Sequence, residues 1–179
     1  MRASGILLPV FSLPGKYGIG GFTKEAYAFV DWLEKAGQKY WQILPLGPTG
    51  FGASPYQSYS TFSGNPFFIS VEELYEEGLI TKEELDSLEM PGNHTYVDYE
   101  EIDVRRWSTL FKAYRRFEGS EEFDLFCSKN AEWLDDYAVF ETLKAIHNDT
   151  PWYEWERPYK LKQKKAIDKL KKDYEDQIR

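Results

Sequence analysis

Two short apolar runs with an amphipathic helix between them restrict the fold more than any other feature of the sequence. The runs are GILLPVFSLPG (5–15) and YWQILPLGP (40–48), and both end at proline and glycine, which is typical of buried strands. Residues 24–36 carry apolar side chains at helical spacing, with Thr23 placed to cap the helix start and Gly37 placed as its C-terminal cap. A strand, a helix and a strand at this spacing predict a βαβ unit with parallel strands. Parallel strands need both faces covered, which two strands cannot do alone.

From residue 70 onwards the pattern becomes helical. Ser70 with Glu73 and Thr81 with Glu84 have the spacing of capping boxes, which open two short acidic helices. Apolar residues at helical spacing predict further helices at 103–117, 130–147 and 161–179, with a short segment through Phe123 and Phe126 before the second of them. The sequence therefore divides into residues 1–69, which contain the strands, and residues 70–179, which are mainly helical.

The last predicted helix lacks a stop signal. Its apolar stripe reaches the end of the sequence, and no glycine, asparagine or proline closes it; the stripe consists of Ile167, Leu170, Tyr174 and Ile178. Together with the two-stranded start, this ending predicts that residues 70–179 are truncated and that the chain is the front of a larger protein.

Composition argues against several classes of function. The 179 residues carry a formal net charge of -8, which disfavours general binding to nucleic acid. Cys127 is the single cysteine, so an intramolecular disulfide or a cysteine-built metal site is excluded. No apolar run approaches the ~20 residues of a membrane span, and no signal peptide is evident. We therefore expect a cytoplasmic protein without a membrane partner, and no metal or cofactor site emerges.

The segment GPTGFGASPYQSYSTFSGNPF (47–67), directly after the second predicted strand, has an unusual composition. It combines glycines, prolines, aromatic residues and hydroxyl groups and contains no charged residue. Ligand sites of α/β proteins lie at the carboxyl ends of parallel strands. Aromatic faces beside hydroxyl and amide groups suit a neutral sugar, and the groups available here include Ser54, Tyr56, Gln57, Ser58, Tyr59 and Ser60. An ordered loop whose aromatic rings pack on neighbouring helices is the structural alternative.

Three segments resemble the sequences of the amylomaltases, the 4-α-glucanotransferases also called disproportionating enzymes. They are GILLPVFSLPGKYGIG (5–20), AYAFVDWLEKAGQKYWQILPLGPTGFGASPYQSYSTFSGNP (26–66) and KNAEWLDDYA (129–138). The chain resembles the amino-terminal part of that family, from Ser4 to about Trp155. The resemblance implies a (β/α)8 TIM barrel with helical insertions, of which this chain supplies the first two parallel strands.

The resemblance also implies a reaction. Family members transfer α-1,4-glucan segments between maltooligosaccharides with retention, and such chemistry needs two carboxyl groups about 5–5.5 Å apart. In the family those carboxylates lie on later strands, so we expect no catalytic residue here and expect the remainder of the same polypeptide to complete the barrel. The alternatives are a non-catalytic glucan-binding fragment and an inactive truncation product.

By the same resemblance, the chain contributes to donor-side binding. Tyr56 should stack on the glucose next to the scissile bond, with Ser54 at that subsite. Gln57 and Ser58 are further candidates, although each can instead brace the loop. Asn65 is a candidate anchor for the loop's return. The sequence departs from the family where Phe51 and Ala53 replace a tyrosine and an aspartate that the family often has.

Other candidate residues favour structural roles. Asp135 and Asp136 are adjacent on a predicted helix and point about 100° apart, which is a poor geometry for a shared catalytic site. His147 extends an apolar helical face, which predicts a structural histidine with its hydrogen bonds satisfied. The aromatic segment TPWYEWERP (150–158) either contacts glucan or, as is more usual for such connectors, clamps the helices beside it.

Overall fold

The computed structural model describes residues 2–50, 52–90 and 96–178 of the chain. These residues form two compact units, Met1–Glu118 and Gly119–Arg179. The boundary between the units differs from the predicted division after residue 69. That division concerned the barrel of a longer protein, and it stays a prediction.

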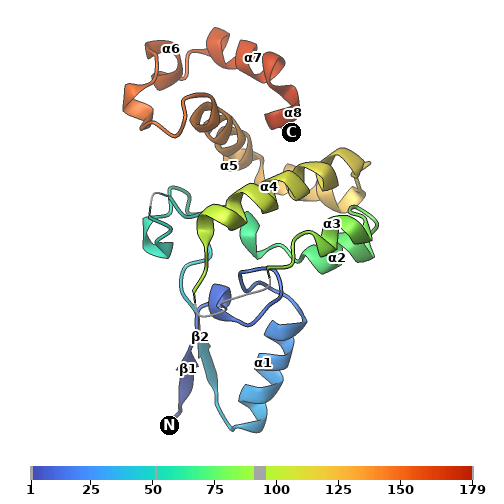
Figure 1. Cartoon of the computed structure of the whole chain (residues 1–179). Coiled ribbons are helices and arrows are strands. Elements are labelled where there is room, and N and C mark those ends of the chain that lie inside the picture. The colour runs from blue at the N-terminus through green and yellow to red at the C-terminus, as the bar shows by residue number, and fades with distance from the viewer. Residues whose placement is uncertain (1, 51, 91–95, 179) are drawn as a thin grey trace. The chain divides into compact units, whose positions relative to one another are not determined.

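A parallel pair of strands begins the first unit, as the sequence predicts. Strand β1 (Gly5–Leu7) lies beside β2 (Tyr40–Gln42), with Gly5 opposite Tyr40, and helix α1 (Lys24–Lys35) connects them (Figure 1). Both strands are shorter than the apolar runs that predict them, and the first run turns into a 3-10 helix at Val10–Ser12. The expectation that the strands are buried is wrong for this chain: Leu7 is 57% exposed and Tyr40 is 67% exposed. A two-stranded sheet with one covering helix leaves strand surface open to solvent.

Helix α1 follows the sequence prediction at its C-terminal end and departs from it at the start. Gly37 has φ of +70° directly after the helix, the left-handed conformation of a C-terminal glycine. Thr23 occupies the N-cap position, but its hydroxyl donates to the Glu25 carboxylate and makes no cap bond to the backbone. The Phe29 ring packs edge-on against Trp41 of β2 with centroids 5.1 Å apart, which fixes the helix on the sheet.

The core of the first unit gathers segments that are distant in sequence. Helices α2 (Val71–Glu76), α3 (Lys82–Asp86) and α4 (Tyr99–Arg116) complete this unit. One buried cluster joins the segment after β1, helix α1, the end of the aromatic loop (residues 47–67) and α4; it consists of Val10, Leu13, Ile19, Ala26, Phe67, Phe68 and Ile102. A second cluster packs α2 and α3 against Tyr17 and Ala113. The loop that follows β2 is therefore rooted in the larger core.

Of the two predicted capping boxes, the one at Thr81 forms in full and the one at Ser70 forms only its Ser70 half. The Ser70 hydroxyl accepts from the Glu73 N–H at 3.2 Å, and Thr81 with Glu84 makes the full reciprocal capping box. Gly78 has φ of +75° after α2, a left-handed conformation that glycine adopts readily at a helix end.

The second unit consists of helices α5 (Glu121–Ile146), α6 (Arg157–Lys160), α7 (Lys164–Asp173) and α8 (Glu175–Ile178). The prediction of a short segment before a helix at 130–147 is wrong, because α5 is continuous over 26 residues. The predicted final helix is also interrupted: Tyr174 leaves the helical conformation, with φ of -126° and ψ of 38°. The core of this unit consists of Val139, Leu143, Trp155 and Leu170. Of the helices described, none has the length and apolar character to cross a membrane.

Candidate functional site

The aromatic loop after β2 is closed at its base by Asn65. The Asn65 N–H donates to the Leu46 carbonyl at 2.8 Å, so the two ends of the loop meet. The Asn65 side chain accepts from the Phe67 N–H at 2.9 Å and caps the 3-10 helix Pro66–Phe68. Asn65 is 6% exposed, and Phe67 and Phe68 belong to the core of the unit. The structure therefore supports the predicted anchoring role of Asn65.

Serine hydroxyls brace the inside of the loop. Ser58 Oγ donates to the Ser60 carbonyl at 2.7 Å and accepts from the Ser60 N–H at 3.3 Å. Gly47 lies against this brace, since a Cβ added to Gly47 would be 2.5 Å from Ser58 Oγ. Ser60 Oγ in turn accepts from the Phe62 and Ser63 N–H groups. The Ser58 hydroxyl is thus used by the loop itself.

Tyr56 lies on a short turn that the loop presents to solvent. The 3-10 helix Pro55–Gln57 begins at Ser54, whose Oγ accepts from the Tyr56 N–H at 3.4 Å. Tyr56 is 73% exposed, so its ring is open to a ligand, and Gln57 is also exposed. Ala53, directly before the turn, has φ of +52°, and Phe51 lies outside the described residues. The predicted site residues Ser54, Tyr56, Gln57 and Ser58 therefore share one turn, and Tyr56 and Gln57 are its exposed side chains.

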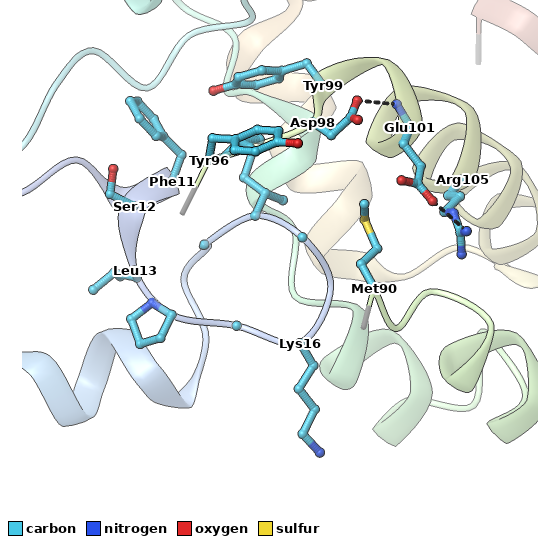
Figure 2. Close-up of a pocket in the computed structure, with 16 residues that line it drawn as sticks. Phe11, Ser12, Leu13, Lys16, Met90, Tyr96, Asp98, Tyr99, Glu101 and Arg105 are labelled. Carbon is cyan, nitrogen blue, oxygen red and sulfur yellow. Dashed lines mark hydrogen bonds and ion pairs between the residues drawn. The ribbon is translucent and has the colours of Figure 1, made fainter. Parts of the chain in front are cut away.

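A hollow lies beside the segment that follows β1. It has a volume of about 1090 Å³ and lies between the segment 11–20 and the start of α4 (Figure 2). Three aromatic rings line part of it, from Phe11, Tyr96 and Tyr99. No sequence motif predicts this hollow. The available signal was the position of 11–20 at the carboxyl end of the first strand.

The charged groups of the hollow are engaged in local contacts. Asp98 accepts from the Glu101 N–H at 3.1 Å and caps α4, while the Glu101 carboxylate pairs with Arg105 at 2.6 Å (Figure 2). Arg105 also donates to the Ser87 carbonyl at 2.9 Å. These groups fix the start of α4, and they do not form a pair of carboxyl groups facing each other across a substrate.

The acidic pair in the second unit is held by lysines. Asp135 lies 3.3 Å from Lys171, and Asp136 lies 2.7 Å from Lys162. Each carboxylate thus binds a different lysine, in keeping with the predicted divergence of the two side chains. Among residues 2–50, 52–90 and 96–178, the structure contains no group of three or more His, Cys, Asp or Glu side chains arranged for a metal ion.

His147 is a structural residue, as its place on an apolar face predicts. Its Nδ1 lies 2.7 Å from the Leu143 carbonyl and its Nε2 lies 2.7 Å from the Glu156 carboxylate. Burial opposes protonation of the imidazole, but its bonds to Glu156 and to Leu143 outweigh burial and raise the pKa of His147. The ring stacks on Trp155 with centroids 5.3 Å apart.

Only part of the aromatic segment 150–158 packs as the predicted clamp. Trp155 is 4% exposed and packs into the helical core, as a clamp should. Trp152 and Tyr153 are 57% and 60% exposed, so they leave their rings in solvent. The clamp interpretation therefore holds for Trp155 alone among these three.

The chain is similar in sequence to proteins that act on glucans. A family model described as 4-alpha-glucanotransferase matches residues 8–179. The 4-alpha-glucanotransferase of Clostridium butyricum is 43% identical over 171 residues, which are 94% of this chain and 35% of that protein. The 4-alpha-glucanotransferase of Thermus thermophilus is 43% identical over 177 residues, which are 95% of this chain and 34% of that protein. The chain thus spans about a third of the length of these curated relatives.

The fold is similar to that of a solved amylomaltase. The amylomaltase from Streptococcus agalactiae, determined in complex with acarbose, superposes with a TM-score of 0.90 at 36% identity. The match covers 99% of this chain and 37% of the amylomaltase. The predicted fold class, the amino-terminal portion of an α/β barrel enzyme with helical insertions, is confirmed by this match and by the parallel strand pair. The chain therefore belongs to the 4-alpha-glucanotransferase family.

Proposed function

We propose that this chain is the amino-terminal part of a 4-alpha-glucanotransferase, in which it supplies a donor-side sugar contact. The complete protein would transfer α-1,4-glucan segments between maltooligosaccharides by a retaining double displacement. The observation that carries the proposal is the Tyr56 ring, which is 73% exposed on a loop that is closed and braced by its own hydrogen bonds.

The chemistry of the loop suits a neutral saccharide. The turn presents a rigid aromatic face, and Gln57 adds an exposed amide beside it. No side chain of residues 47–67 carries a charge, so the loop lacks the cations that a phosphorylated ligand would require. The acarbose complex of the Streptococcus agalactiae amylomaltase supports a saccharide-type ligand for this family. Tyr56 and Ser54 are the proposed sugar contacts, with Gln57 beside them and Ser58 as a brace.

The catalytic groups are proposed to come from the rest of the polypeptide. Retaining transfer needs a nucleophile and an acid/base about 5–5.5 Å apart. Glu84 and Asp98 serve as helix caps, Glu101 binds Arg105, and Asp135 and Asp136 bind lysine side chains. The relatives are about three times as long as this chain, which leaves room for further strands beside the exposed β1 and β2. We further propose that the complete protein is cytoplasmic.

Maltotriose distinguishes the proposal from its alternatives. The complete polypeptide should convert maltotriose into glucose and longer maltooligosaccharides, whereas the 179-residue chain alone should yield no products. A titration of the chain with maltotriose then separates a glucan-binding fragment, which shows saturable binding, from an inactive product, which shows none. A ladder of products from the isolated chain, free of host enzyme, would contradict the proposed origin of the carboxylates.

A further inference from the structure

Three arginines of α4 donate hydrogen bonds to backbone carbonyls of earlier segments of the first unit. Arg105 donates to the Ser87 carbonyl at 2.9 Å, and Arg116 donates to the Leu79 carbonyl at 3.0 Å. Arg106 donates from Nη1 to the Ile69 carbonyl at 3.0 Å. Arg106 differs from the other two because it is only 4% exposed and because its acceptor follows the aromatic loop.

The surroundings of Arg106 are costly for a cation. Its Nε is buried and has no hydrogen-bond partner. Desolvation lowers the pKa of Arg106 to about 10, although the nearby Glu72 carboxylate acts in the opposite direction. Taking a charged guanidinium out of water costs free energy, which the bond to Ile69 and the Glu72 carboxylate offset only in part. Stability alone therefore does not account for an arginine at this position.

The bond that Arg106 makes lies at the exit of the loop. Asn65 closes the loop, the 3-10 helix Pro66–Phe68 follows, and Ile69 is the C-terminal cap of that helix. The Phe68 carbonyl also accepts from the Phe22 N–H at 3.4 Å. The exit segment is thus held by the core on its apolar side and by the Arg106 guanidinium at its last carbonyl.

We propose that Arg106 is a positioning residue for the Tyr56 loop. Its bond to Ile69 fixes where the loop returns to the fold and so sets the direction in which the Pro55–Gln57 turn presents Tyr56 to an α-1,4-glucan. This inference rests on the proposed saccharide function of the loop. In this role Arg106 affects kcat/KM for the sugar through the backbone of the loop and does not contact the sugar itself.

The test compares Arg106→Met with Arg116→Met in the complete glucanotransferase polypeptide. Arg106→Met keeps the length and packing of the side chain but loses the donor to Ile69. Because the loop is then held less firmly, kcat/KM for maltotriose should fall about 10-fold, mainly through a higher KM. The unfolding temperature should stay nearly unchanged. Arg116→Met breaks the ion pair with Glu84 and should lower the unfolding temperature while leaving kcat/KM as it was.

Amide hydrogen exchange shows whether the effect of the substitution is confined to the exit of the loop. In Arg106→Met, exchange at Asn65 and Phe67 should accelerate several-fold, while exchange at Leu85 in α3 should stay unchanged. If the methionine variant does not fold, both measurements are made on Arg106→Gln, whose side chain is too short to reach the Ile69 carbonyl. Wild-type kcat/KM and wild-type exchange at Asn65 in a folded variant would overturn the inference.

The two proposals can fail separately. If Tyr56→Ala leaves maltotriose transfer intact, the sugar contact assigned to the loop is wrong, whatever Arg106 does. If Tyr56→Ala impairs transfer but Arg106→Met and Arg106→Gln do not, the sugar contact stands and the positioning role of Arg106 is wrong.

Discussion

The Asn65 N–H donates to the Leu46 carbonyl over 2.8 Å, and this bond joins the end of β2's apolar run to the exit of the aromatic loop. The loop is therefore closed at its base by a backbone hydrogen bond. Because Asn65 is buried and Tyr56 is exposed, the base of the loop is buried and its tip is exposed to solvent. This arrangement gives an aromatic ring the rigidity that a sugar-stacking role requires.

The close approach of Gly47 to Ser58 predicts that the loop tolerates no side chain at its entrance. A Cβ at Gly47 would lie 2.5 Å from Ser58 Oγ and 3.1 Å from the Ser60 carbonyl, so Gly47→Ala should displace the serine brace. The expected loss is about 1–2 kcal/mol in the free energy of unfolding, as for other overpacked sites. Affinity for maltotriose should fall as well.

Gly64→Ala is the matched control for this prediction, at the other end of the loop. A Cβ at Gly64 meets no atom within 4 Å, so the variant should unfold at the wild-type denaturant concentration or slightly above it. Equal stability of the two alanine variants in urea unfolding would contradict the close contact between Gly47 and Ser58.

The Glu84–Arg116 pair predicts a dependence of stability on acid pH. Two hydrogen bonds from Arg116 and one from the Thr81 N–H lower the pKa of Glu84 to about 2, from an ordinary value of 4.5. Since the folded state holds the carboxylate in its ionised form, this stabilisation is complete above pH 4.5 and is lost as the pH falls through about 2. The stability advantage of the wild type over Glu84→Gln should therefore be largest above pH 5 and shrink towards pH 2, as followed by urea unfolding. An advantage that stays constant over this range would argue against the ion pair as its source.

The His147–Glu156 pair predicts the opposite trend near neutral pH. Because its hydrogen bonds raise the pKa of His147 above 6.5, the stabilisation is complete below pH 6.5 and is lost as the pH rises through the folded-state value. Amide exchange at Val139 and Leu143, in the core of the second unit, should be slower at pH 6 than at pH 8 after correction for intrinsic exchange.

Glu156→Gln provides the control for this trend, since it removes the carboxylate that favours the imidazolium. Corrected protection in that variant should differ less between pH 6 and pH 8. A variant that keeps the full difference would place its origin elsewhere in the unit.

Local rules predicted much of this fold because the relevant signals lie close together in sequence. Helix α1 with Gly37 and the caps at Ser70 and Thr81 follow from spacing within a few residues, and the parallel strands follow from the order strand, helix, strand. The loop's anchoring by Asn65 was also accessible, since asparagine before proline is a typical start for a short helix.

Features that depend on tertiary contacts could not be predicted in the same way. The interruption of the final helix at Tyr174 places Tyr174 and Ile178 against the core around Leu143, a contact that no local pattern reveals. Arg106 looks like a surface residue of an amphipathic helix, and its burial depends on packing beside Ile69, far away in sequence. The exposure of β1 and β2 likewise depends on what lies beside the sheet, and not on the strands themselves.

The central claim is that Tyr56 forms a sugar-stacking contact, and Tyr56→Ala compared with Tyr56→Phe tests it most directly. The measurement is kcat/KM for maltotriose disproportionation by the complete polypeptide carrying each substitution. Phenylalanine keeps the ring and should retain activity within about 3-fold, whereas alanine removes the stacking surface and should lower kcat/KM by at least about 10-fold, as expected for a loss above ~1.4 kcal/mol. Because the Tyr56 side chain is exposed, both variants should unfold like the wild type. Wild-type kcat/KM in the alanine variant would contradict the account.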